Sequence, residues 1–337
     1  MDEKIFVNDD AWKKSFSFLG HFALGHVIAI ISDDFDRLVD THFVAKKWSL
    51  GSLKILRATG SDSAEIAKLD VPNGTEVERN LPIPIRPPPA NVIGFRHLQI
   101  SFINKSVVEF LQRIRPLFDS SGTNVYIECY GDDQKRVWKI IWQRLWPLVT
   151  CNIRALRVSG IQLGRLRQFS PTILLDCAKL QSVYSLAHFP EFPPNDNANS
   201  SPGQAVANWL VTPRNDGVPK MFQCQFYSTG MDKLKQDFSE ASKPANFIIR
   251  VQAASNAVIE TFEPVKNDKS GEQLTLRRRK NKWLLVRSPI ERNQEQWAKW
   301  EEEAFEWEGH NQWNRIGISF SEDAIGVGMG AKRCLIS

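Results

Sequence analysis

The sequence contains few cysteines, and their number and spacing argue against a zinc site and a disulfide framework. Five occur in 337 residues, and no two of them are separated by only two residues. An odd number without such spacing argues against a zinc-finger-like site and against a fully paired disulfide framework. The opening MDEKIFVNDD lacks the apolar core of a signal peptide, and no run approaches the roughly 20 apolar residues of a bilayer span. We therefore expect a cytoplasmic or nuclear protein in a reducing compartment.

The sequence also lacks the short motifs that carry common enzymatic chemistry. Its 6 histidines have no metal-ligand spacing to one another or to a cysteine. There is no HExxH, no phosphate-binding GxxxxGK[ST], no GxGxxG after a predicted strand and no GxSxG nucleophile elbow. The sequence therefore predicts a protein that is not an enzyme and that uses neither a cofactor nor a metal ion.

A strong charge of either sign is missing as well. The 43 basic and 38 acidic residues leave a net charge of +5, which does not call for a nucleic-acid or membrane partner. The densest basic run, RRRKNK at 277–282, has two interpretations. It is either a nuclear-import or nucleic-acid patch, or a set of charges at a hairpin tip that keeps a sheet edge soluble. We favour the second interpretation.

Strand-like runs recur at a regular interval between residues 91 and 257. They centre on Gln99, Ile127, Leu156, Tyr184, Cys224 and Ile249. These centres lie 28, 29, 28, 40 and 25 residues apart, and the long interval contains a Pro/Asn/Ser-rich loop. Amphipathic helices are expected between the strands, the first behind a capping box at Ser106 to Glu109. A strand and a helix repeating about every 28 residues are typical of a leucine-rich-repeat-like array with a parallel sheet. A compact parallel-sheet α/β domain is the alternative.

The regions around this array have different patterns. Leu53, Ile55 and Leu56 in the stretch Trp48 to Arg57 predict a strand that starts the second domain. Residues 54–90 are assigned to a linker, which ends in LPIPIRPPPA at 81–90, too rich in proline for a helix or a central strand. Residues 258–320 are expected to form antiparallel strands and one helix that cap the open edge of the parallel sheet. The last strand of this region is predicted at Arg315 to Phe320. Residues 321–337 are assigned to a flexible tail. Because strands and helices alternate through residues 91–257, the expected fold class is α/β.

The first 53 residues carry a separate helical pattern. Asn8 or Asp9 can cap a helix with apolar residues at helical spacing, and two further short helices follow a break at Gly20. A segment of this size is too small to bury a core that would hold it alone. Its remaining apolar surface should therefore be covered by the next domain or by another protein.

These residues resemble an F-box, the adaptor-binding motif of substrate receptors in cullin-based ubiquitin ligases. The resemblance lies in VNDDA at 7–11, FSFL at 16–19 and ISDDFDRLV at 31–39. Asn8, Ser15 and the pair Asp33-Asp34 depart from the usual residues of that family. The whole arrangement is similar to lineage-expanded nematode F-box families, in which a C-terminal domain holds the target.

The resemblance implies a non-catalytic substrate receptor that binds a Skp-type adaptor, and through it a cullin, and that presents an unknown protein substrate. The alternative is a protein-interaction scaffold that has lost the adaptor contact. Buried aromatic and aliphatic side chains dominate interface energetics. The expected adaptor-binding residues are Val7, Phe16, Phe18, Leu19, Leu24, Ile28, Ile31, Phe35 and Leu38.

The last four residues of the sequence, CLIS, match a prenylation box with Cys334 as the modified residue. Lys332 and Arg333 lie directly before it. One lipid gives only marginal anchoring without a second signal. We therefore expect a membrane contact only if Cys334 is prenylated.

Overall fold

A computed structural model gives the architecture of the chain. It describes residues 8–19, 24, 28, 31–69, 80–129, 134–185, 189–225, 228–252, 262–279, 282–306 and 313–329. These residues form one sheet of 13 strands, a second sheet of two strands, and helices on both faces of the larger sheet. The expected α/β fold class is confirmed, with a sheet that is parallel in its centre and antiparallel at both ends.

The centre of the large sheet contains eight parallel strands. In spatial order they are β2 (Ser52–Arg57), β6 (His97–Ile100), β15 (Arg315–Ile318), β7 (Thr123–Ile127), β8 (Ile153–Arg157), β9 (Ser182–Tyr184), β10 (Lys220–Gln225) and β11 (Phe247–Gln252). The strands expected around Gln99, Ile127, Leu156, Tyr184, Cys224 and Ile249 are therefore all present.

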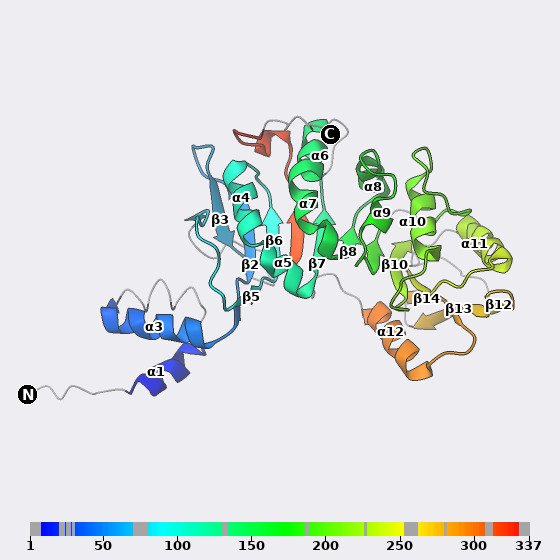
Figure 1. Cartoon of the computed structure of the whole chain (residues 1–337), viewed down its shortest axis with the longest axis horizontal. Helices are drawn as coiled ribbons and strands as arrows, with labels where there is room; N and C mark the ends of the chain where they lie inside the picture. Colours follow the sequence, from blue (N-terminus) through cyan, green and yellow to red (C-terminus); the bar gives the residue numbers. More distant parts are fainter. Residues whose placement is uncertain are drawn as a thin grey trace, which may run out of the picture.

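The helices between these strands pack on one face of the sheet (Figure 1). They are α4 (Lys105–Arg113), α5 (Arg115–Ser121), α6 (Lys135–Ile140), α7 (Trp146–Val149), α8 (Gly160–Arg167), α9 (Ile173–Asp176), α10 (Pro202–Val211) and α11 (Ser228–Glu240). A π-helical turn, Ile141–Leu145, joins α6 to α7. Apolar side chains from alternate strand positions and from one face of each helix form a single large core. This core fixes the direction in which the remaining strand side chains point.

Helix α4 begins at a different residue from the one predicted. Its N-cap is Asn104, whose Oδ1 accepts a hydrogen bond from the Val107 backbone N–H at 3.1 Å. Ser106 lies inside the helix and donates its hydroxyl to the same Asn104 oxygen at 2.8 Å. The predicted capping box at Ser106 is therefore wrong, because the asparagine two residues earlier already satisfies the free N–H groups of the first turn.

Residues 54–90 are not simply a linker. Strand β2 pairs with β6, and β3 (Ala64–Lys68) pairs antiparallel with β2. Ile66 is buried in the main core and gives β3 its place in the sheet. The proline-rich run contributes only the two-residue edge strand β4 (Leu81–Pro82), as the missing N–H groups of proline require.

The two ends of the predicted capping region have different places in the sheet. Strands β12 (Val265–Asn267), β13 (Glu272–Arg279) and β14 (Lys282–Pro289) form the expected antiparallel extension beyond β11. Helix α12 (Gln294–Glu306) covers β11 and β14 on the face opposite to the other helices. Strand β15 does not extend this edge. It runs parallel between β6 and β7, so its prediction as an antiparallel cap is wrong.

One buried side chain anchors the start of β15. Asn314 directly precedes the strand, has a left-handed φ of 52° and is 1% exposed. Its Oδ1 accepts the Phe95 backbone N–H at 3.1 Å, and its Nδ2 donates to the Leu117 carbonyl at 3.0 Å and to the Gly122 carbonyl at 3.4 Å. The three contacts join residues that are 219, 197 and 192 positions apart in the sequence, whereas the local pattern only predicts that Ile316 and Ile318 belong to a strand.

Among the residues that the structure describes, no helix combines the length and the apolar character needed to cross a bilayer.

Candidate protein-binding surfaces

The N-terminal helices form a small lobe with a core of its own. Helix α1 (Asp9–Phe16) begins at Asn8, whose Oδ1 accepts the Asp10 N–H at 3.2 Å. Helix α3 (Asp33–Ala45) begins at Ser32, whose hydroxyl accepts the Phe35 N–H at 3.4 Å. The lobe core is separate from the main core, and it consists of the buried residues Phe16, Leu24, Leu38 and Val39 with Trp12, Ile28, Phe35 and Phe43 packed around them.

The lobe projects from the end of the sheet that carries β2 and β3 (Figure 1). Its junction is narrow. Asn91 donates its side-chain amide to the carbonyls of Phe43, at 3.1 Å, and of Val44. Strand β1 (Trp48–Ser49) pairs with β5 (Val92–Gly94), and the Phe43 and Trp48 rings lie 5.4 Å apart. The junction therefore leaves much of the surface of the two helices uncovered.

The predicted adaptor-binding residues divide into two groups. Phe16, Leu24 and Leu38 are buried and Ile28 and Phe35 are half-buried, so these residues hold the lobe together. Phe18, Leu19 and Ile31 point outward, with exposed fractions of 83%, 41% and 59%. Val7 lies outside the described residues.

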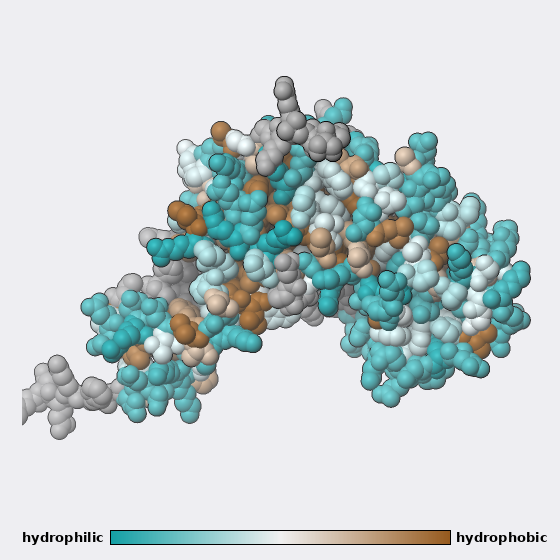
Figure 2. All heavy atoms as spheres, in the orientation of Figure 1, coloured by the Kyte–Doolittle hydropathy of each residue, from teal (hydrophilic) through white to brown (hydrophobic). Residues whose placement is uncertain are grey.

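Val44, which the sequence analysis did not single out, is 75% exposed on the last turn of α3. Figure 2 shows apolar side chains among the polar surface of this region. Ile31 precedes the first turn of α3 and Val44 lies on its last turn, so apolar side chains are exposed at both ends of this helix.

A second surface lies on the face of the sheet opposite to helices α4 to α11. The strand register places one residue from each central strand in a single lateral row, in the order Lys54, Gln99, Gly317, Tyr126, Arg157, Tyr184, Gln223 and Arg250. The neighbouring row contains Ser52, His97, Arg315, Asn124, Ala155, Ser182, Met221 and Ile248. Helix α12 covers the end of this face near β11.

No family model, curated protein or solved structure matches this chain.

The middle of the second surface is an alternating series of arginine and tyrosine side chains, which we call the Arg-Tyr ladder: Arg315, Tyr126, Arg157 and Tyr184. The Arg315 guanidinium carbon lies 5.5 Å from the centroid of the Tyr126 ring. The Arg157 guanidinium carbon lies 5.7 Å from the Tyr126 centroid and 4.8 Å from the Tyr184 centroid. Cation–π contacts of this kind hold both guanidinium groups in place.

The surroundings of the ladder are partly desolvated. Burial raises the pKa of Tyr126 and lowers the pKa of Arg315. Burial, followed by the nearby Arg315 charge, lowers the pKa of His97 to about 4, so this imidazole is neutral at pH 7. Gly317 leaves room for its neighbours, because a Cβ there would lie 2.1 Å from Gln99 Oε1 and 3.0 Å from His97 Nε2. The positive charge of the ladder region is therefore carried by arginine and lysine.

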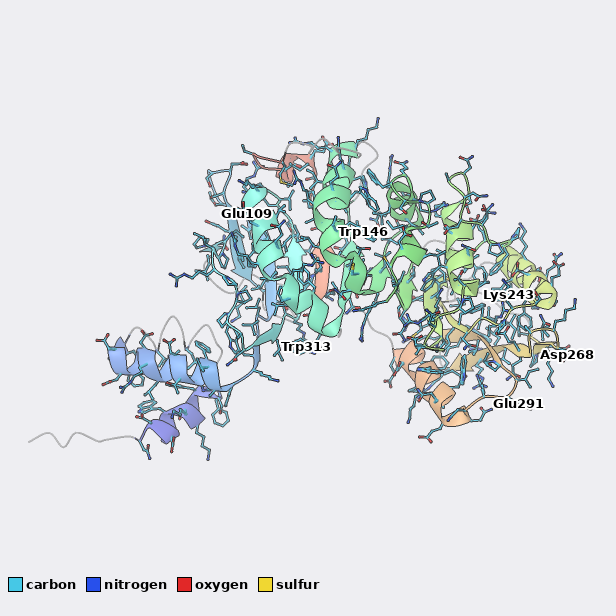
Figure 3. The ribbon with its side chains drawn as sticks, in the orientation of Figure 1. Glu109, Trp146, Lys243, Asp268, Glu291 and Trp313 are labelled. Carbon is cyan, nitrogen blue, oxygen red and sulfur yellow. The ribbon has the colours of Figure 1, made fainter. Side chains whose placement is uncertain are left out.

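The sequence analysis located the strands of this surface but missed the surface itself. The relevant signal is a polar or aromatic residue between two apolar ones, as at Gln99 between Leu98 and Ile100. This pattern does not identify Arg315 as part of the surface. Only the insertion of β15 beside β7 brings Arg315 next to Tyr126. Trp313, at the start of this segment, lies between the lobe and α12 (Figure 3).

The basic run at 277–282 is engaged within the fold. Arg277 forms an ion pair with Glu301 of α12 at 2.6 Å, and Arg279 pairs with Glu302. Arg278 stacks over the Trp283 ring at 5.2 Å. Lys280 and Asn281 lie outside the described residues. Arg277 and Arg279 therefore help to hold α12 on the sheet, which fits the structural interpretation of the run better than a nucleic-acid patch.

The remaining candidate groups are the cysteines and possible metal ligands. Cys129, Cys177 and Cys224 are buried, and Cys151 is exposed, whereas Cys334 lies outside the described residues. Within the described part of the chain, no three His, Cys, Asp or Glu residues come together in a way that could hold a metal ion.

Proposed function

We propose that this protein is a non-catalytic substrate-recognition subunit of a cullin-type ubiquitin ligase. In this proposal the N-terminal lobe is a divergent F-box that binds a Skp-type adaptor, and the sheet domain, taken as a leucine-rich-repeat-like array, holds a target protein. The observation that carries the proposal is an apolar lobe that stands apart from the main core while Phe18, Leu19 and Ile31 stay exposed.

Exposed phenylalanine and isoleucine side chains contribute strongly to protein interfaces. Burying a Phe or Ile side chain that was exposed is favourable by about 1.5 to 3 kcal/mol. Phe18 and Ile31 together could therefore supply a substantial part of the affinity of a micromolar complex, which needs about 8 kcal/mol.

The experiment is a pull-down of the full chain with a purified Skp-type adaptor. The variants F18S and I31S should each weaken adaptor binding at least tenfold, because each removes an exposed apolar contact. I161S is the matched control, since Ile161 is also exposed, at 70%, but lies on α8 in the sheet domain. Unchanged melting temperatures of all three variants would show that folding is intact. Equal adaptor binding by F18S, I31S and the wild type would refute the proposal.

A second candidate function is an interaction scaffold without an adaptor contact. The three departures from the F-box pattern have local structural roles in the lobe. Asn8 caps α1, the Ser15 hydroxyl donates to the Ala11 carbonyl at 3.0 Å, and Asp33 and Asp34 lie in the first turn of α3. These roles explain the residues without an adaptor. Failure of the wild-type chain to retain adaptor at micromolar concentration would favour this second function.

A further inference from the structure

A cavity beside helix α6, which we call the α6 pocket, is lined mainly by basic side chains. Its volume is about 270 Å³. The residues that line it are Lys135, Arg136, Lys139, Ile140, Gln143, Arg144 and Met329. Of these described residues, four are basic and none is an aspartate or a glutamate. Ligand pockets in proteins have volumes from roughly 300 Å³ upward, so the α6 pocket has room for one compact molecule.

The helix geometry gathers the basic residues on one side. Lys135 and Lys139 lie one turn apart on α6, and the π-helical turn Ile141–Leu145 follows directly. Because a π turn holds about one residue more than an α turn, Arg144 lies about one turn beyond Lys139 and lines the same cavity. Turns of this kind are rare in helices and occur frequently at functional sites. The local backbone therefore favours a cluster of cations around the α6 pocket.

The α6 pocket has an apolar base and a charged rim. Ile140 and Met329 are buried, with exposed fractions of 4% and 5%. The side chains of Lys135, Arg136 and Lys139 are exposed. Among the residues that the structure describes, these three side chains form no ion pair. Like charges around one cavity repel one another, and an anion bound between them would relieve that repulsion.

The pocket lies near the edge of the sheet at which the parallel strands end. Helix α6 follows β7 in the chain and begins at this edge (Figure 1). In open α/β sheets, ligands bind outside the carboxyl ends of the strands. The segment after β15 reaches the same place, because Glu322 Oε1 accepts the Arg136 backbone N–H at 3.3 Å and Met329 lines the pocket. The charge of Glu322 should therefore oppose the binding of an anion.

The charge of the lining indicates the class of ligand. A phosphate group carries a charge of about −1.5 to −2 at pH 7 and has three strong acceptor oxygens. Lysine binds phosphate as a point charge, and arginine binds it through a planar fork of N–H donors. Two phosphate groups can therefore balance the four basic residues within this small volume, whereas two carboxylates supply only half of the charge.

We propose that the α6 pocket binds a small ligand that carries two or more phosphate groups. The rim cations Lys135, Arg136 and Lys139 pair with the phosphate oxygens, and the apolar base of Ile140 and Met329 contacts the part of the ligand between them. A free metabolite and the headgroup of a lipid both have this chemistry. The inference goes beyond the proposed function, because neither adaptor binding nor target binding requires this cavity.

Isothermal titration calorimetry of the full chain with inorganic tripolyphosphate tests the pocket directly. The wild-type chain should bind one tripolyphosphate, at least tenfold more tightly than citrate, because three carboxylates carry less charge and fewer acceptor oxygens than three linked phosphates. Added salt should weaken the binding, since the rim is exposed to solvent.

Four variants locate the binding site. K135Q and K139Q should each weaken tripolyphosphate binding about threefold, and the double variant about tenfold, because each removes one solvent-exposed charge contact. K233Q is the matched control, since Lys233 is an exposed lysine on α11, at the other end of the same layer of helices. E322Q keeps an acceptor for the Arg136 N–H but loses the negative charge, so it should tighten binding about twofold. Equal melting temperatures of these variants without ligand would show that folding is intact.

Vesicle sedimentation distinguishes the two sources of the phosphate groups. The probes are vesicles of phosphatidylcholine that contain phosphatidylinositol bisphosphate, and vesicles of phosphatidylcholine alone. Sedimentation of the wild-type chain with the first vesicles only, reversed by tripolyphosphate and lost in the double variant, would assign a lipid headgroup. Binding of tripolyphosphate without sedimentation would assign a free ligand. Either result supports the proposed site.

Several results would overturn the inference. It fails if tripolyphosphate does not bind at millimolar concentration, if citrate binds equally well, or if the correctly folded double variant binds like the wild type. Equal loss of binding in K233Q would show a general charge effect without a site. A single-stranded RNA that binds more tightly than tripolyphosphate, and loses this affinity in the double variant, would identify a nucleic-acid surface instead.

Discussion

Replacing Asn314 by alanine should destabilise the protein by about 3 kcal/mol. The substitution leaves the buried Phe95 N–H without its acceptor and removes the donor to the Leu117 and Gly122 carbonyls. An orphaned buried donor costs about 2 kcal/mol, and a left-handed alanine costs about 1 kcal/mol more than asparagine, which tolerates this conformation. The site is 1% exposed, so water cannot replace these bonds without local opening.

Two further variants separate the two contributions. Glycine also loses the side-chain bonds but adopts the φ of 52° without strain, so N314G should be about 1 kcal/mol more stable than N314A. Asn124 provides the control. It is half-buried, and among the described residues its side chain donates only to the Trp313 carbonyl, at 2.8 Å, so N124A should cost about 1 kcal/mol or less.

The assay is urea unfolding of the full chain, followed by tryptophan fluorescence. The expected order of stability is wild type, N124A, N314G and N314A. An N314A variant within about 1 kcal/mol of the wild type would refute the argument that this side chain holds β15 between β6 and β7, because a buried donor without a partner costs more than that.

Three other expectations concern the same sheet and the cysteines. His97 has a folded pKa of about 4 against an ordinary 6.5, so the unfolded chain binds more protons between these values and the free energy of unfolding should fall as pH is lowered from about 6.5 to about 4. H97Q should show a shallower fall in urea titrations over this range, and an identical profile would contradict the assignment. G317A should lower stability by about 1 to 3 kcal/mol in urea, because its Cβ would lie 2.1 Å from Gln99 Oε1. An unchanged midpoint would mean that Gln99 moves aside freely. A thiol reagent should modify Cys151 in the native protein, whereas burial raises the pKa of Cys129 and Cys177 to about 12 and protects them until urea is added. Peptide mapping by mass spectrometry checks this, and native labelling of Cys177 would disagree with its buried position.

The sequence by itself determined the local elements. Alternation of apolar residues predicted the strands around Gln99, Ile127 and Ile249, and their regular spacing predicted parallel pairing between successive units. Helical spacing predicted α1 and α3 as a group apart from the repeats, because these patterns depend only on neighbouring residues.

Only the tertiary structure decided which distant segments meet. Ile316 and Ile318 would suit an edge strand or a central one equally well, and Asn314 places them between β6 and β7 through bonds to Phe95 and Leu117. The same insertion brings Arg315 against Tyr126 and completes the Arg-Tyr ladder. The exposure of Phe18 beside the buried Phe16 likewise depends on how α1 and α3 pack. Local spacing does not specify such contacts, because they are chosen by the free energy of burial and hydrogen bonding across the whole fold.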